Sequence, residues 1–212
     1  VRGSAPEVQG TGGDGERCVE DESTEGLSDL TRYLAQQNVS LETVTLARRE
    51  AIGEEVALIA IIGPTHPFLE DEVSLLSGYL STGGRLLVLL DPLMETGLEP
   101  LLAGWGVVVG DDIVVDAGQQ LPFVSAGNLF ITTYAQHPIV EKMKTLMTLF
   151  PLARSIEPAK TLPEGISAQA LALTTDQGWG ETNTDATQFQ YQKGEDLEGP
   201  VSVAVAAEQQ EP

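Results

Sequence analysis

The single cysteine, Cys18, is the first residue to consider for chemistry, because a thiolate is a strong nucleophile. It lies in the run E-R-C-V-E-D-E, and neighbouring carboxylates disfavour the negatively charged thiolate. A catalytic cysteine also needs a histidine and an acid around a sharp strand-to-helix turn, which this run does not provide. We therefore predict an unreactive thiol, and a single cysteine excludes an internal disulfide.

The two histidines, His66 and His137, are each followed by proline at the expected start of a helix. An imidazole at such a position commonly caps the helix or fills a turn, and neither histidine has a partner at motif spacing. The isolated histidines and dispersed carboxylates also lack the spacings of zinc and calcium sites. We therefore predict capping or surface roles for both histidines, no metal site and no cofactor.

Acidic and aromatic residues offer two further candidates. Asp111, Asp112 and Asp116 bracket a short apolar run, where acids are usually solvated turn residues. Trp179 could anchor a partner protein, whereas Trp105 falls on an apolar helical stripe and is interpreted as core. None of these residues forms a recognisable catalytic constellation, so the sequence predicts no catalytic residue.

The elements that would position a site centre on a strand, helix and strand in succession. Val56–Ile62 is an uninterrupted apolar run closed by Gly-Pro, which is typical of a strand buried on both faces. Apolar residues then recur at helical spacing over Phe68–Leu80, and a second apolar run follows at Leu86–Leu90. This length suits a right-handed crossover, so the two strands are predicted to be adjacent and parallel.

Parallel strands joined by a helix end at the same edge of a sheet, where open α/β folds bind ligands. Thr65 and His66 follow the first predicted strand, and Asp91 follows the second. These three residues are therefore candidates for a binding edge. The alternative is that the glycines and prolines beside them serve only as turn residues.

Composition and charge limit the classes of partner. The chain of 212 residues has 32 acidic and 11 basic residues, a formal net charge of −21 and no basic run. A phosphate backbone and an anionic membrane face are therefore poor partners, and we expect no nucleic-acid binding. No stretch approaches the roughly 20 apolar residues of a membrane-spanning helix, so membrane attachment would need segments absent from this chain.

Most of the chain is predicted to form one domain. Residues 1–22 are rich in Gly, Asp and Glu and form a flexible segment. Alternating helical and strand patterns then fill residues 23–207, which we assign to a single α/β domain. Within it, residues 175–199 are predicted to be a long polar excursion, and residues 208–212 form a tail.

Several motifs carry a family resemblance when taken in order. The run from I-I-G-P-T-H-P (61–67) to L-L-V-L-L-D-P (86–92), followed by G-L-E-P-L-L-A-G-W-G-V-V-V-G-D-D-I-V-V-D (97–116), resembles the auxiliary domain of uncharacterised ABC-type transport systems, the GldG-like gliding-motility family. G-D-G-E-R (13–17), A-L-T-T-D-Q-G-W-G-E (172–181) and G-E-D-L-E-G-P-V-S-V-A-V-A (194–206) resemble its early turn, late segment and closing strand.

The resemblance implies a three-layer sandwich with a mainly parallel central sheet, either flavodoxin-like or class I glutamine-amidotransferase-like. It also implies an extracytoplasmic position, tethered to a membrane, and it adds Gly13, Gly15 and Glu16 to the candidate edge. One departure is that Val8-Gln9-Gly10-Thr11 is too polar and glycine-rich for an apolar first strand.

Two functional hypotheses follow. The first is a non-catalytic, periplasmic-side auxiliary domain that binds a partner protein or a transported substrate, with the permease, the ATPase or accessory subunits as partners. The second is a small-molecule-binding or hydrolytic α/β enzyme that uses the carboxyl edge of the sheet.

Overall fold

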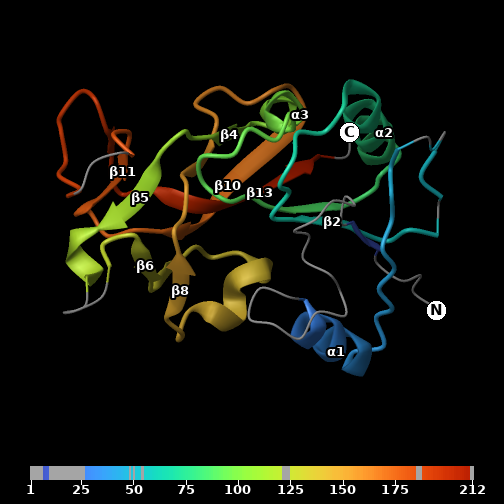
Figure 1. The fold of residues 1–212 in the computed structure, drawn as a ribbon, viewed down its shortest axis with the longest axis horizontal. Helices are drawn as coiled ribbons and strands as arrows, with labels where there is room; N and C mark the ends of the chain where they lie inside the picture. The colour runs from blue at the N-terminus through green and yellow to red at the C-terminus, as the bar shows by residue number, and fades with distance from the viewer. Residues whose placement is uncertain are drawn as a thin grey trace. The chain divides into compact units, whose positions relative to one another are not determined.

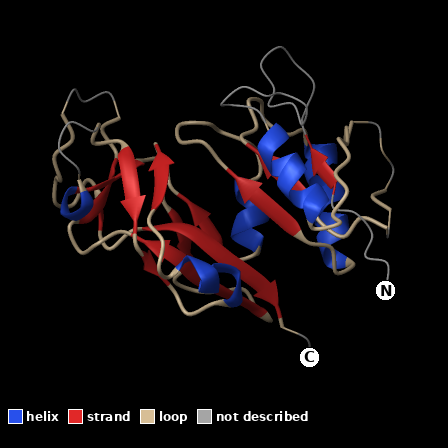
Figure 2. Ribbon diagram, turned by 90° about the horizontal axis from the view of Figure 1, so that it is seen from below, coloured by secondary structure: helices blue, strands red, loops and turns tan. Residues whose placement is uncertain are grey.

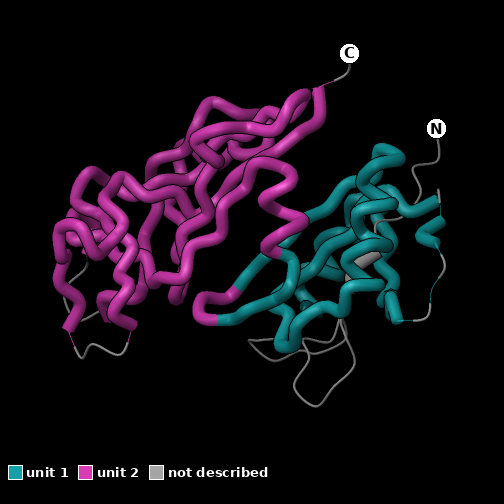
Figure 3. The backbone as a smooth tube through the Cα atoms, turned by 90° about the horizontal axis from the view of Figure 1, so that it is seen from above, with its two compact units in different colours: residues 1–90, 94–98 teal, residues 91–93, 99–212 magenta. Residues whose placement is uncertain are grey.

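The computed structural model describes residues 7–9, 27–47, 49, 51–53, 55–120, 125–184 and 188–210 (Figure 1). Contacts between Cα atoms divide the chain into two compact units, coloured separately in Figure 3. Unit 1 comprises residues 1–90 and 94–98, and unit 2 comprises residues 91–93 and 99–212. A compact unit is not by itself a domain, so the single domain expected over residues 23–207 stays a prediction.

Unit 1 contains a small parallel sheet with strand order β1-β2-β3. Strand β2 (Ile59–Ile62) pairs in parallel with β3 (Leu86–Leu89), and Ile59 lies opposite Leu86. The predicted pairing of these two apolar runs is therefore confirmed. On the other side, β1 (Glu7–Gln9) pairs in parallel with β2, so a strand does precede the early glycine-rich turn despite its polar composition.

Helix α2 (Glu70–Ser81) connects β2 to β3 as the apolar spacing predicts. Its first turn is closed by Glu72, whose carboxylate accepts a hydrogen bond of 2.9 Å from the Leu69 backbone N–H. Leu76 is fully buried, and the Tyr79 hydroxyl donates to the Val56 carbonyl oxygen at 3.1 Å, which ties the helix to the segment entering β2. Helix α1 (Ser28–Gln36) also belongs to unit 1.

Unit 2 is built mainly from short antiparallel strands, which stand out in red in Figure 2. Its sheets have the orders β13-β10-β7, β12-β11-β5, β4-β9 and β6-β8. The elements are α3 (Glu99–Gly104), β4 (Val107–Val109), β5 (Ile113–Asp116), η1 (Ala117–Gln119), β6 (Asn128–Ile131), β7 (Thr133–Tyr134), η2 (Pro138–Met143), β8 (Thr148–Pro151), β9 (Ile156–Pro158), β10 (Ile166–Leu173), β11 (Gly178–Glu181), β12 (Leu197–Glu198) and β13 (Ser202–Gln209).

The core of unit 2 is small and aliphatic. Val114 of β5, Leu129 and Ile131 of β6, and Val201 are at most 1% exposed and pack in one cluster with Ala153 and Ala172. These side chains come from several of the short sheets, so the cluster holds together strands that share no hydrogen bonds.

The predicted three-layer sandwich with a mainly parallel sheet is wrong. The apolar runs of β4 and β5 are typical of buried strands, but only Gly110, Asp111 and Asp112 separate them. A parallel connection needs a crossover of a dozen or more residues. Accordingly, β4 pairs with β9 and β5 pairs with β11, both antiparallel, and parallel pairing of named strands is confined to unit 1 among the described residues.

Two segments also differ from their predicted secondary structure. The alternating apolar residues of Val39–Leu46 predict a short strand, but the segment forms no regular strand, although Val44 and Leu46 are buried. The stretch 175–199, predicted as a polar excursion, contains β11, whose four residues are all buried. Burial of this polar segment depends on partners elsewhere in unit 2.

Candidate functional site

The predicted edge is only partly described. Thr65 and His66 follow β2 in unit 1 and are both exposed, with Thr65 Oγ1 and His66 Nδ1 3.0 Å apart. The preceding Gly63 has a φ of +54° and donates its N–H to the Leu89 carbonyl at 2.9 Å, so β2 and β3 end side by side. Asp91 follows β3 and belongs to unit 2.

Gly13, Gly15 and Glu16 lie outside the described residues, as does Cys18. The six-residue binding edge and the unreactive thiol therefore stay predictions. Of the six residues, the structure brings Thr65 and His66 together.

His137 is a cap, as predicted. Its Nδ1 accepts a hydrogen bond of 3.2 Å from the Ile139 backbone N–H at the start of η2. Among the described residues, no group of three or more histidine, cysteine or acidic side chains is arranged to hold a metal ion.

The carboxylates that bracket β5 are buried, which the sequence interpretation did not foresee. Asp112 is 4% exposed and accepts hydrogen bonds from Ser155, 2.8 Å from the backbone N–H and 2.6 Å from the hydroxyl. A Cβ atom on Gly180 of the neighbouring strand β11 would lie 2.5 Å from Asp112 Oδ2, so glycine leaves the space for this carboxylate. Asp112 therefore ties β5 to the segment that enters β9.

Asp116 closes the other end of β5 in the same manner. It is 6% exposed and accepts hydrogen bonds from the Thr175 hydroxyl at 2.6 Å, the Thr175 N–H at 2.7 Å and the Gly118 N–H at 2.9 Å. The prediction of solvated turn residues is wrong for Asp112 and Asp116, and it holds for the exposed Asp111. The physical reason is that donors distant in the sequence replace the water that these carboxylates lose.

Strand β11 and its following loop carry two more buried carboxylates. Glu181, which is 1% exposed, accepts from the Trp179 indole N–H at 3.3 Å and from the backbone N–H groups of Asn183 and Gln190 at 3.0 and 3.2 Å. Trp179 is itself only 9% exposed, so it is a core residue and not a surface anchor.

Asp196 holds the loop together from its other end. It accepts from the Thr182 N–H and hydroxyl, each at 3.0 Å, and from the Gln192 N–H at 2.7 Å. Burial alone raises the pKa of Asp196, but these hydrogen bonds lower it more, so the pKa lies below its ordinary value of 3.8. The charged form of Asp196 is therefore the one that the folded loop favours.

Glu157 of β9 has the opposite shift. Burial raises its pKa above the ordinary value of 4.5, a hydrogen bond of 2.6 Å from the Ser202 N–H opposes the rise, and the nearby charge of Asp112 adds to it. Burial thus makes the charged form of Glu157 less favourable. By contrast, Asp112, Asp116, Glu181 and Asp196 each accept hydrogen bonds from two or more donors.

The network of Asp112, Asp116, Glu181 and Asp196 is held by hydrogen-bond donors of the fold itself. Its carboxylate oxygens accept hydrogen bonds from backbone N–H groups, hydroxyls or an indole, and each acid fixes the ends of strands or loops. Leaving one of these buried donors unpaired costs about 1–3 kcal/mol. We therefore interpret the network as structural.

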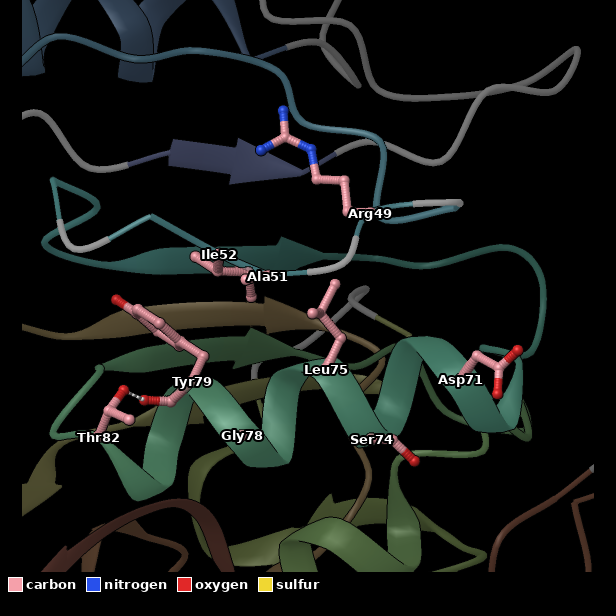
Figure 4. Close-up of a pocket in the computed structure, with 9 residues that line it drawn as sticks. All are labelled: Arg49, Ala51, Ile52, Asp71, Ser74, Leu75, Gly78, Tyr79 and Thr82. Atoms are coloured by element: carbon pink, nitrogen blue, oxygen red, sulfur yellow. Dashed lines mark hydrogen bonds between the residues drawn. The ribbon is translucent and has the colours of Figure 1, made fainter.

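Unit 1 has a groove among its described residues that could hold a ligand. It has a volume of about 410 Å³ and runs between α2 and the segment around Ala51 and Ile52 (Figure 4). Leu75 of the helix faces Ala51 and Ile52 across it, and a Cβ atom on Gly78 would meet no heavy atom within 4 Å. The remaining lining residues are polar or partly polar: Arg49, Asp71, Ser74, Tyr79 and Thr82.

The size and lining of the groove suit a bound ligand. The volume lies in the range of small-ligand pockets, about 300–1,000 Å³, and the apolar centre with hydroxyl groups at the side can hold an extended apolar segment. Sequence analysis did not find this groove, because the segment that forms its second wall has no regular secondary structure.

Comparison with known proteins identifies the family. The model of the family described as "ABC-type uncharacterized transport system" matches residues 11–212, so the chain belongs to this family of transport-system auxiliary domains. No curated protein matches the chain. In fold, it is similar to the mmIFT52 N-terminal domain, with a TM-score of 0.60, 19% sequence identity, and coverage of 82% of this chain and 74% of that one.

Proposed function

We propose that this auxiliary domain is a non-catalytic binding module that acts on the extracytoplasmic side of its transport system and docks a protein partner of the transporter. The observation that carries the proposal is that four buried carboxylates of unit 2 are each bonded to donors of the fold and hold its strand ends and loops. Membership of the transport-system family supports the choice of partner.

We place the docking site in the groove of unit 1. A partner segment with apolar side chains can lie along Leu75 and Ile52, and the hydroxyls of Ser74 and Thr82 can bond to its backbone. None of the described groove residues forms a nucleophile and base pair, which is consistent with a binding role.

The test uses two serines of α2. Ser74 lines the groove, whereas Ser77 is exposed on the same helix and is not among the lining residues. We expect Ser74→Trp to fill the groove and to weaken co-purification with the cognate permease and ATPase, and Ser77→Trp to leave it unchanged. Equal co-purification of both variants with the wild-type yield would refute the groove as the docking site.

The extracytoplasmic position has its own test. In a Cys18→Ser background, Ser77→Cys places one exposed thiol on α2. A membrane-impermeant maleimide should label this cysteine in intact cells as completely as in lysed cells. Labelling only after lysis would place the domain in the cytoplasm.

The second candidate function is binding of a small molecule, which the volume of the groove favours. A thermal-shift screen of small apolar and zwitterionic solutes separates the two candidates. Stabilisation of the wild type and of Ser77→Trp, but not of Ser74→Trp, would assign the groove to a solute.

A further inference from the structure

A surface formed by Lys142, Lys144, Leu146, Met147 and Leu149, here called the apolar-basic surface, is unlike the rest of unit 2. Of the ten large hydrophobic side chains that are exposed among the described residues of unit 2, five fall within residues 139–152. These five are Ile139, Leu146, Met147, Leu149 and Leu152. Exposed apolar side chains gathered in this way mark an interaction surface.

The local backbone presents these side chains outward. The Leu146 N–H donates to the Met143 carbonyl at 2.8 Å, and this turn places Leu146 and Met147 at the entrance to β8 with exposures of 56% and 57%. Along β8, Leu149 is 48% exposed while Phe150 is half-buried, so one face of the strand points away from the core. Among the described strands, β8 pairs with β6 alone and is an edge strand (Figure 1).

The charge of this part of the chain has the opposite sign to that of the whole. Between Asp116 and Glu157 the sequence holds one acidic residue, Glu141, and three basic ones, although the chain carries a net charge of −21. Glu141 forms an ion pair of 3.0 Å with Lys144. Lys142 and Lys144 thus leave a positive balance beside the exposed apolar side chains.

We propose that the apolar-basic surface binds the interface of a lipid bilayer that contains anionic headgroups. Leucine and methionine side chains can enter the boundary between headgroups and acyl chains, while lysine stems extend back so that their ammonium groups meet the phosphates. Charges that lie more than about 8 Å from the membrane surface are largely screened at physiological ionic strength. The expectation that an anionic membrane is a poor partner rested on the net charge and the absence of a basic run, and the local charge leads to the opposite inference.

The experiment measures co-sedimentation of the full chain with large unilamellar vesicles of phosphatidylcholine alone or mixed equally with phosphatidylglycerol. We expect binding to the mixed vesicles that falls when salt is added. Lys142→Glu changes the charge by two units, and each unit near the membrane surface is worth about fivefold in binding. This variant should therefore bind about 25-fold more weakly. Leu146→Ser should weaken it by about tenfold or more, the effect of exposing a leucine side chain.

Two control variants separate the local surface from general effects. Lys160→Glu changes the net charge by the same amount at another exposed lysine, and Leu69→Ser removes a leucine that is 66% exposed in unit 1. Both should bind vesicles like the wild type. Absence of binding to mixed vesicles, or equal losses in the controls, would overturn the proposal.

A further arm decides between lipid and protein. This arm uses transporter subunits that are solubilised in detergent and free of anionic lipid. If these subunits bound the wild type but not Leu146→Ser, while vesicles bound neither the wild type nor Leu146→Ser, the surface would be a protein interface. The lipid proposal would then be wrong. Vesicles contain no protein, so the outcome does not depend on the docking role proposed for the groove.

Discussion

We expect alanine substitution at two glycines of unit 1 to change the stability of α2 in opposite directions. Gly78 lies in the interior of α2, and Gly83 follows the helix with a φ of +91°. In both cases an added Cβ atom would meet no heavy atom within 4 Å, so steric overlap with other side chains is absent. The two sites therefore differ in backbone conformation and not in the space around them.

The magnitudes follow from that difference. Alanine at Gly78 keeps the helical backbone and restricts the unfolded chain, so Gly78→Ala should raise the stability of α2 by about 0.5–1 kcal/mol. Alanine at Gly83 must adopt a left-handed conformation, which costs about 1–2 kcal/mol. The backbone N–H of Gly83 also donates to the Leu80 carbonyl at 3.0 Å, so the residue cannot rotate away without losing this bond.

Hydrogen exchange of α2 peptides in the full chain is the appropriate assay, because it reports the opening free energy of this helix separately from unit 2. We expect slower exchange in Gly78→Ala and faster exchange in Gly83→Ala, with a difference of about 1.5–3 kcal/mol between them. Equal exchange in the two variants, or faster exchange in Gly78→Ala, would refute the assignment of these backbone conformations.

Four further predictions concern the core, the buried carboxylates and the thiol. Leu76→Ala, at a fully buried position, should cost about 2–5 kcal/mol by urea denaturation, whereas Leu69→Ala at an exposed position should cost less than about 0.5 kcal/mol. Because the pKa of Glu157 is raised in the folded state, the wild type should lose stability relative to Glu157→Gln as pH rises above 4.5; parallel titrations would contradict this. Because the pKa of Asp196 is lowered, its contribution to stability is present above pH 3.8 and is lost as the pH falls through the lowered pKa, so Asp196→Asn should be most harmful near neutral pH and the gap to the wild type should narrow in acid. Cys18→Ser should leave folding and binding unchanged, and rapid stoichiometric alkylation of the native thiol at neutral pH would show a missed thiolate.

The part of the fold that the sequence predicts well is the part whose contacts are local. Strand β2, helix α2 and strand β3 follow one another within residues 59–89, and apolar periodicity alone indicates the type and order of each. Their parallel pairing follows from the length of the connection. By contrast, β5 pairs with β11 about sixty residues later, and no periodicity within either strand specifies that partner.

The same distance in sequence explains why the buried carboxylates were missed. Asp116 looks like a turn residue until Thr175, 59 residues away, supplies two of its three hydrogen bonds. A signal was nevertheless present in G-W-G-E at residues 178–181, because alternate glycines in a strand indicate close approach of another group. For Gly180 that group is the Asp112 carboxylate.

The burial of these acids changes what the composition says about partners. A net charge of −21 suggests a uniformly acidic surface, yet Asp112, Asp116, Glu181 and Asp196 are each at most 9% exposed and hold loops of unit 2. Neutral donors hold these charges in place without cancelling them, so what a partner meets depends on where the other charges are exposed. The local distribution of exposed charge, including the lysines beside β8, is therefore a better guide to binding than the formal total, and it is the quantity that the vesicle experiment measures.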